Sequence, residues 1–71
     1  MLKNKKIGFI GIGNMGQAII NGIIVSKIVT AENIGIYDIN ETIRNHAINT
    51  FSVKSVEDPV TAVEKYDIIL I

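Results

Sequence analysis

Short, almost continuously apolar runs alternate along the chain with longer segments in which apolar residues recur at helical spacing. Apolar runs of this kind are typical of parallel strands that are covered on both faces. Segments with apolar residues every three or four positions predict helices that bury one face. No repeat or low-complexity tract interrupts the alternation. The pattern therefore predicts the order βαβαβαβ, which is typical of a parallel sheet connected by helices.

Four strands and three helices follow from this pattern. The strands are expected at about Lys6 to Ile12, Ile34 to Asp38, Ser52 to Lys54 and Asp67 to Ile71. The helices are expected at about Asn14 to Ser26, Glu41 to Asn49 and Pro59 to Lys65, with a connection at Val29 to Asn33 in which Thr30 can cap a short turn. The apolar residues of the first helix cover more than one stripe, so this helix is expected to be buried on several sides or to pack against something absent.

Two of the helices carry clear start signals. Asn40 can cap the second helix, with Glu41 placed favourably in its first turn. Asp58 can cap the third helix, and Pro59 fits the first helical position because no N–H is needed there. These local signals predict where both helices begin.

In the first predicted strand, Ile10 is followed directly by a glycine motif, G-x-G-x-x-G, formed by Gly11, Ile12, Gly13, Asn14, Met15 and Gly16. A strand that ends in a glycine turn and feeds a helix brings backbone N–H groups and a positive helix end to one point, where a diphosphate fits. Gly11 permits the tight turn, Gly13 lets the backbone approach the phosphates, and Gly16 lets the helix pack closely on its strand. The motif predicts a dinucleotide site.

Asp38 lies at the end of the second predicted strand, 22 residues after Gly16. A carboxylate there can accept hydrogen bonds from the adenosine ribose hydroxyls. Taken alone, Asp38 would equally fit an ordinary acid in a turn, and its spacing from the glycines favours the ribose. Its charge would repel a 2′-phosphate, and no Arg follows it before Arg44. Local chemistry therefore favours NAD over NADP.

Strands, helices, glycine motif and acid together predict a Rossmann-type, doubly wound parallel sheet of order 3-2-1-4. The crevice beside the first and fourth strands is then the topological switch point, where a cofactor cleft begins. The chain stops inside or at the end of an apolar fourth strand, which leaves an apolar edge. We expect residues 1–71 to be a truncated sheet, the amino-terminal part of a dinucleotide-binding domain.

Composition excludes several other classes. Seven basic and seven acidic residues give no net field that would attract nucleic acid or an anionic membrane. No apolar run approaches the ~20 residues that cross a bilayer, and the chain contains no cysteine. We expect a cytoplasmic protein without a metal site. His46 is expected on a helix surface, Tyr37 and Tyr66 are expected to pack, and no residue pattern predicts a catalytic residue.

The stretch from Ile7 to Gly22, IGFIGIGNMGQAIING, closely resembles the amino-terminal signature of pyrroline-5-carboxylate reductases, in particular G-N-M-G-x-A-I-I-x-G. Glu32-Asn33-Ile34 and Asp67-Ile68-Ile69-Leu70 also look like that family's entries into the second and fourth strands. The likeness covers nearly the whole chain, and it is more specific than the glycines alone.

The resemblance implies a parent enzyme that reduces the C=N bond of 1-pyrroline-5-carboxylate with NADH or NADPH, giving proline. It implies cofactor contacts at Ile10 to Met15 and at Asp38, Ile39 and Asn40. It also implies a helical second domain, absent here, that forms a homo-oligomer and binds the imine substrate. Family members that prefer NADPH often have Ser, Thr or Arg near positions 38 and 39. Pro59 stands where an Asn that reaches the cofactor is common.

Other functions remain open at this point. The same amino-terminal domain occurs in other oxidoreductases, such as coenzyme-F420-linked NADP reductases and 3-hydroxyacid dehydrogenases. A non-catalytic nucleotide-binding module, or an inert fragment, also fits. We expect the 71-residue chain alone to have no turnover.

Overall fold

The computed structural model describes residues 4–71. Its strands are β1 (Ile7–Ile10), β2 (Ile34–Tyr37), β3 (Lys54–Ser55) and β4 (Ile68–Leu70). Its helices are α1 (Gly13–Ser26), the short 3₁₀ helix η2 (Ala31–Asn33), α2 (Glu41–Phe51) and α3 (Pro59–Lys65). No helix in the described range is long and apolar enough to cross a membrane.

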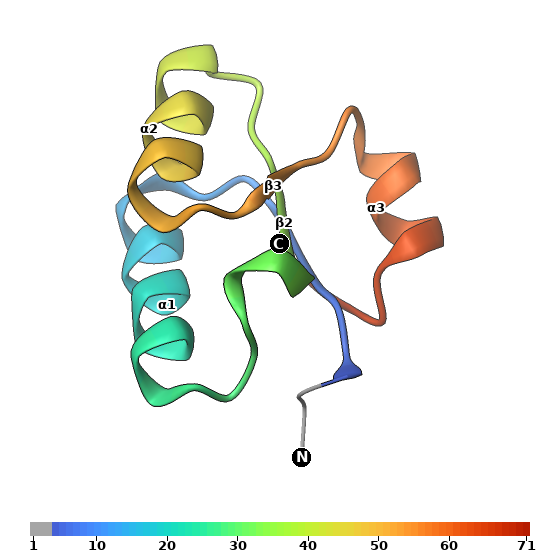
Figure 1. The fold of residues 1–71 in the computed structure, drawn as a ribbon. Helices are drawn as coiled ribbons and strands as arrows, with labels where there is room; N and C mark the ends of the chain where they lie inside the picture. Colours follow the sequence, from blue (N-terminus) through green and yellow to red (C-terminus); the bar gives the residue numbers. More distant parts are fainter. Residues whose placement is uncertain (1–3) are drawn as a thin grey trace.

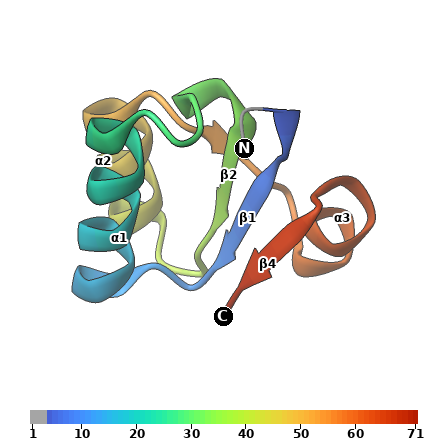
Figure 2. The same cartoon turned by 90° about the horizontal axis from the view of Figure 1, so that it is seen from below.

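The four strands form one parallel sheet in the order β3-β2-β1-β4 (Figure 2). β1 lies between β2 and β4, and Gly8 is in register with Gly35 on one side and with Ile69 on the other. The α/β class, the alternation of strands and helices, and the strand order 3-2-1-4 are confirmed. The sheet therefore places the carboxyl ends of β1, β2 and β4 at one edge, where doubly wound sheets bind their ligands.

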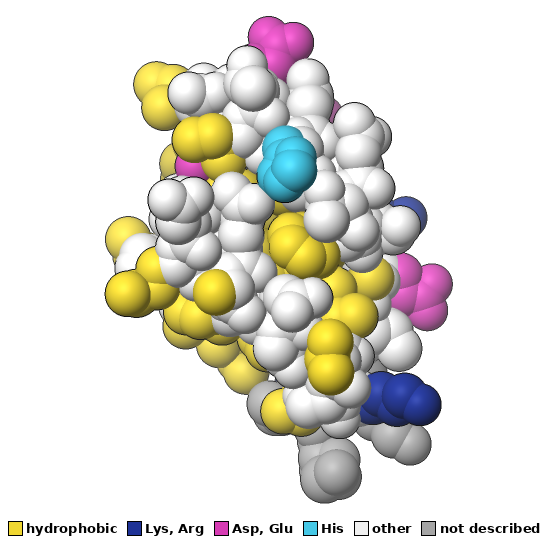
Figure 3. Space-filling model, turned by 90° about the vertical axis from the view of Figure 1, so that its left-hand side faces the viewer, with side chains coloured by type: hydrophobic (Ala, Val, Ile, Leu, Met, Phe, Trp, Pro, Cys, Tyr) yellow, Lys and Arg dark blue, Asp and Glu magenta, His cyan; other side chains and the backbone are white. Residues whose placement is uncertain are grey.

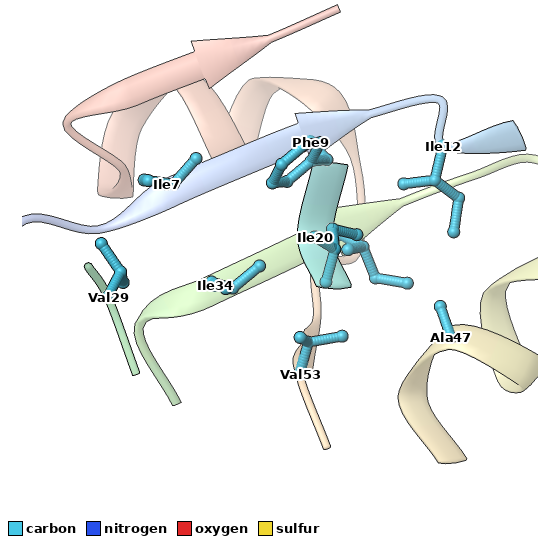
Figure 4. Packing of buried hydrophobic residues seen from close by; sticks show 9 residues of the cluster. Ile7, Phe9, Ile12, Ile20, Val29, Ile34, Ala47 and Val53 are labelled. Atoms are coloured by element: carbon cyan, nitrogen blue, oxygen red, sulfur yellow. The ribbon is translucent and has the colours of Figure 1, made fainter. Parts of the chain in front are cut away.

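Helices cover the two faces of the sheet unequally. α1 and α2 lie on one face, and α3 lies alone on the other (Figures 1 and 2). Alternate strand residues point toward α1 and α2 and form the main core with residues from the helices and turns (Figure 4). The buried members of this core are Ile7, Phe9, Ile12, Ile20, Val29, Ile34, Ile36, Ala47 and Val53. All of them precede α3 in the sequence.

The opposite face of the sheet is built around an aromatic ring. The paired strand residues Gly8 and Gly35 lie under Tyr66, which follows α3. A Cβ at Gly8 would come within 3.2 Å of Tyr66 Cγ, and a Cβ at Gly35 would overlap the end of the ring. The expectation that Tyr66 packs near a strand end is confirmed, and burial raises the pKa of its hydroxyl.

The predicted helix starts of α2 and α3 are confirmed. Asn40 Oδ1 accepts a hydrogen bond from the Ile43 backbone N–H at 3.1 Å, and Asp58 Oδ1 accepts one from the Thr61 N–H at 2.8 Å. Thr30 occupies the N-cap position of η2, but its side chain makes no capping hydrogen bond.

Three boundaries differ by two residues from the expected ones, and the other differences are of one residue. β1 ends at Ile10 because Gly11 has a φ of 80°, which strands do not adopt. α2 continues past Asn49 to Phe51, where Ser52 takes a left-handed conformation as the C-cap. β3 therefore begins at Lys54 instead of Ser52.

Of the two alternatives expected for α1, burial on several sides is wrong for the described structure, and packing against something absent stays a prediction. Ile20 is its only fully buried residue, whereas Met15 is 78% exposed and Val25 is 69% exposed. Figure 3 views the side of the molecule formed by α1 and α2 and shows hydrophobic side chains at its surface. Several apolar side chains of α1, among them Met15 and Val25, therefore lie outside the core.

Candidate functional site

The glycine turn joins β1 to α1 in a conformation that depends on glycine. Gly11 has a φ of 80° and Gly13 a φ of 44°, in the left-handed region that other residues rarely adopt. The Gly11 backbone N–H donates to the Tyr37 carbonyl oxygen at 2.7 Å, so the turn is tied to the end of β2. A Cβ built on either glycine meets no atom within 4 Å. The outer side of the turn is therefore open to a ligand.

Gly16 lies one turn into α1, and its role differs in detail from the expected one. A Cβ there would lie 3.1 Å from Ile12 Cβ and 3.6 Å from Ile12 Cγ2. The close neighbour is thus a residue of the turn and not of the strand. Ile12 is 3% exposed, so its side chain is held in the core and has little room to yield. Glycine at position 16 allows the turn to lie tightly against the helix.

The start of α1 differs from the starts of α2 and α3. Ile12 is its N-cap residue and makes no side-chain capping bond, and the first turn contains no acidic residue. Asn40 and Asp58 cap the other two helices with their side-chain oxygens. The first turn of a helix has N–H groups without intrahelical acceptors and a partial positive charge. An anion bound at the glycine turn would lie close to these N–H groups and to the partial positive charge.

Asp38 lies directly after β2, and its carboxylate points into the protein. Oδ2 accepts a hydrogen bond from the Ile12 backbone N–H at 3.0 Å, and Oδ1 accepts one from the Asn40 backbone N–H at 2.9 Å. These donors, Asn40 foremost, lower the pKa of the carboxyl below its ordinary value, although burial acts in the opposite direction. Asp38 is 9% exposed and is ionised at neutral pH.

The residues after Asp38 are more exposed. Ile39 is 88% exposed, and Asn40 is exposed while its side chain caps α2. Arg44, in the first turns of α2, reaches back so that its Nη1 donates to the Asp38 carbonyl oxygen at 2.8 Å. The guanidinium group of Arg44 therefore lies beside this turn. The position of Arg44 in the sequence did not predict this contact.

A hollow with a volume of about 250 Å³ lies next to the glycine turn. Four of the predicted site residues line it, namely Gly11, Ile12, Met15 and Gly16. The other lining residues are Phe9, Ile19, Leu70 and Ile71. The sequence reasoning did not name these four, but the strand order 3-2-1-4 places Leu70 and Ile71 beside the turn. The walls of the hollow are mainly apolar side chains from α1 and β4.

The ten predicted site residues thus gather at one edge of the sheet. Ile10 to Gly16 form the end of β1, the turn and the start of α1, and Asp38 to Asn40 form the neighbouring turn after β2. Hydrogen bonds from Gly11 and Ile12 to the end of β2 connect the two segments. His46 is exposed on α2, and within residues 4–71 no group of three or more His, Cys, Asp or Glu residues is arranged to hold a metal ion.

Comparison with known proteins relates the chain to oxidoreductases. Residues 6–71 match the family described as "NADP oxidoreductase coenzyme F420-dependent". The chain is also 37% identical over 70 residues to the pyrroline-5-carboxylate reductase of Methanosarcina acetivorans. This alignment covers 99% of the chain and 26% of the relative, so the chain spans about a quarter of that protein's length. The predicted resemblance to the amino-terminal part of pyrroline-5-carboxylate reductases is confirmed.

Proposed function

This chain belongs to the family of coenzyme F420-dependent NADP oxidoreductases, and from that membership we propose that it binds a nicotinamide dinucleotide at the Gly11 to Gly16 turn. The observation that carries the proposal is the open glycine turn in front of a helix that lacks a side-chain cap. Backbone N–H groups and the helix dipole converge there, as diphosphate binding requires. The chain is then the cofactor-binding part of an oxidoreductase.

The two segments of the site take different parts of the cofactor. Ile10 to Gly16 hold the diphosphate, with Gly13 allowing close approach because no Cβ intervenes. Asp38, Ile39 and Asn40 lie at the adenosine ribose. The ionised Asp38 carboxylate disfavours a 2′-phosphate, and Arg44 offsets part of this charge. We therefore expect NADH to bind somewhat more tightly than NADPH.

The activity proposed for the whole protein is reduction of the C=N bond of 1-pyrroline-5-carboxylate to proline, a step of proline biosynthesis. The alignment with the Methanosarcina acetivorans reductase and the G-N-M-G-x-A-I-I-x-G signature support it. The bound nicotinamide supplies the hydride, and residues 1–71 hold and orient the adenosine diphosphate end. A further, substrate-binding domain would bind the imine and form the homo-oligomer. The protein would act in the cytoplasm, without nucleic acid or membrane partners.

The family match also favours a second candidate, in which the whole protein transfers hydride between NADP and coenzyme F420. Both candidates use the site described here, so residues 1–71 do not distinguish them. Turnover of the whole protein does, because only one of pyrroline-5-carboxylate and reduced coenzyme F420 would be consumed. With either substrate we expect the 71-residue chain alone to show no turnover.

Cofactor binding is tested by titrating the chain with NADH and with NADPH and following nicotinamide fluorescence. A Gly13→Ala variant adds one methyl group where the phosphates approach and strains a backbone with a φ of 44°, so we expect it to weaken binding by about tenfold or more. Gly22→Ala is the matched control, because Gly22 lies on the same helix and a Cβ there also meets no atom within 4 Å. It should bind like the wild type. Equal binding by all three chains, or no saturable binding by the folded wild type, would contradict the proposal.

A further inference from the structure

We propose that Asp38 is a positioning residue whose carboxylate clamps the glycine turn to the turn after β2. The proposal concerns the shape of the unliganded site, and its consequence for cofactor affinity rests on the function proposed above. In this role Asp38 contributes to affinity through the backbone of the glycine turn. A carboxylate that acted only on the ribose would affect the adenosine end alone.

The clamp joins segments that are far apart in the sequence. Ile12 and Asp38 are 26 residues apart, and their N–H to Oδ2 bond is buried. The second oxygen, Oδ1, holds the Asn40 N–H two residues further on. Each carboxylate oxygen therefore holds one of the two turns. With a side chain only 9% exposed, the carboxylate faces the protein backbone more than a ligand.

The clamp holds Ile12, the residue between the two most flexible positions of the glycine turn. Ile12 is the N-cap residue of α1 and lies between the two glycines with positive φ. Glycines have the largest conformational freedom of all residues, so a turn with two of them needs outside bonds to stay in one shape. Two such bonds reach the end of β2, from the Gly11 N–H to the Tyr37 carbonyl and from the Ile12 N–H to Asp38. Of the two, only the second depends on a side chain.

The ionic character of the bond makes it strong. Hydrogen bonds from backbone N–H groups to a carboxylate are roughly twice as strong as those between neutral groups. Replacing Asp38 with Asn keeps one oxygen acceptor and turns the other position into an NH₂ group, which faces an N–H donor. One of the two turns then loses its partner, and either the buried Ile12 N–H or the part-buried Asn40 N–H is left without an acceptor.

The clamp and a direct ribose contact make opposite predictions for NADPH. If Asp38 acted only on the ribose, Asp38→Asn would weaken NADH binding and leave NADPH binding unchanged or stronger, because a repelling charge is removed. If Asp38 holds the glycine turn, both cofactors lose affinity, since both place a diphosphate there. We expect about a tenfold loss for NADH, the size of one charge-assisted hydrogen bond, and a smaller loss for NADPH, because the change also removes the charge that disfavours its 2′-phosphate.

Asp67→Asn is the matched control for this test. Asp67 Oδ2 accepts a hydrogen bond from the Lys6 backbone N–H at 2.9 Å, so the same kind of bond is altered at the opposite end of β1. This variant should bind both cofactors like the wild type. Loss of affinity in Asp38→Asn for NADH alone, or equal losses in both variants, would overturn the clamp.

Hydrogen exchange of backbone amides, measured by NMR on the free chain, tests the clamp without a ligand. The Ile12 and Asn40 amides lie outside every helix and strand, yet they should be protected in the wild type. In Asp38→Asn at least one of them should exchange about tenfold or more faster, while Asp67→Asn leaves both unchanged. Unprotected Ile12 and Asn40 amides in the wild type would overturn the clamp even if no variant folds. Failure of the wild type to bind cofactor would refute the proposed function and leave this result standing.

Discussion

At the scale of single residues, two paired strand glycines determine how the less covered face of the sheet packs. Gly8 and Gly35 are opposite each other in register, and Tyr66 lies across both. A glycine in a strand interior costs backbone entropy and provides no side chain for packing. Here the missing side chains make room for an aromatic ring, which contributes more apolar area than two small side chains would.

Gly35→Ala should therefore destabilise the chain. Its Cβ would overlap Cζ and Oη of Tyr66 and lie 2.8 Å from Cε2, so the whole ring would have to move. Overpacking of this kind typically costs about 1–3 kcal/mol in the free energy of unfolding. Urea unfolding followed by circular dichroism measures the change.

Tyr66→Ala supplies the control for that experiment. Once the ring is absent, Gly35→Ala should cost less than it does in the wild type, and the double-mutant cycle gives the coupling free energy. Equal costs in the two backgrounds would show that Tyr66 does not occupy the space above Gly35.

At the scale of elements, the features that could be predicted are those that depend on neighbouring residues. The caps Asn40 and Asp58 and the proline at the start of α3 act within one helical turn, so the sequence alone located them. The exposure of α1 could not be predicted from neighbouring residues. Its apolar residues cover more than one stripe, but how much of a helix is buried depends on what lies against it.

Asp58→Ala should lower stability without affecting the cofactor site. The change removes the hydrogen bond from the Thr61 N–H and leaves one donor of the first turn of α3 without its partner. Loss of a cap costs about 1 kcal/mol. Thermal or urea unfolding measures the effect, and NADH affinity should stay at the wild-type value.

Asp58→Ser serves as the comparison, because a serine hydroxyl can cap the same N–H. It should retain most of the stability that alanine loses. If the serine variant were as unstable as the alanine variant, the loss of stability would come from a property of Asp58 other than its capping oxygen.

At the scale of the whole molecule, the sequence predicted the topology but not the internal bonding of the site. A glycine motif, an acid at the right spacing and alternating elements are consistent with one sheet order, and the structure has that order. The bond from Ile12 to Asp38 could not be predicted, because nothing local indicates which way a carboxylate turns. The same holds for Arg44, whose contact with the Asp38 carbonyl depends on how α2 is placed.

The unequal cover of the two faces predicts unequal local stability. Every buried residue of the main core precedes α3 in the sequence. α3 contributes the buried Ala62, while Val60 and Val63 are 65% and 62% exposed. Opening α3 therefore removes far less apolar surface from the interior than opening β1 or β2 does. Regions with few buried apolar contacts open with free energies below that of global unfolding.

Native-state hydrogen exchange in low concentrations of urea tests this expectation. The Tyr66 amide, which donates to the Ala62 carbonyl at 3.0 Å, should exchange through a local opening that depends little on urea. Amides of β1 and β2 should exchange only through global unfolding, with the full dependence on urea. If the Tyr66 amide followed the β1 amides at every urea concentration, α3 would belong to the same cooperative unit as the main core. The packing of Tyr66 on Gly8 and Gly35 would then link the two faces of the sheet more strongly than their buried areas indicate.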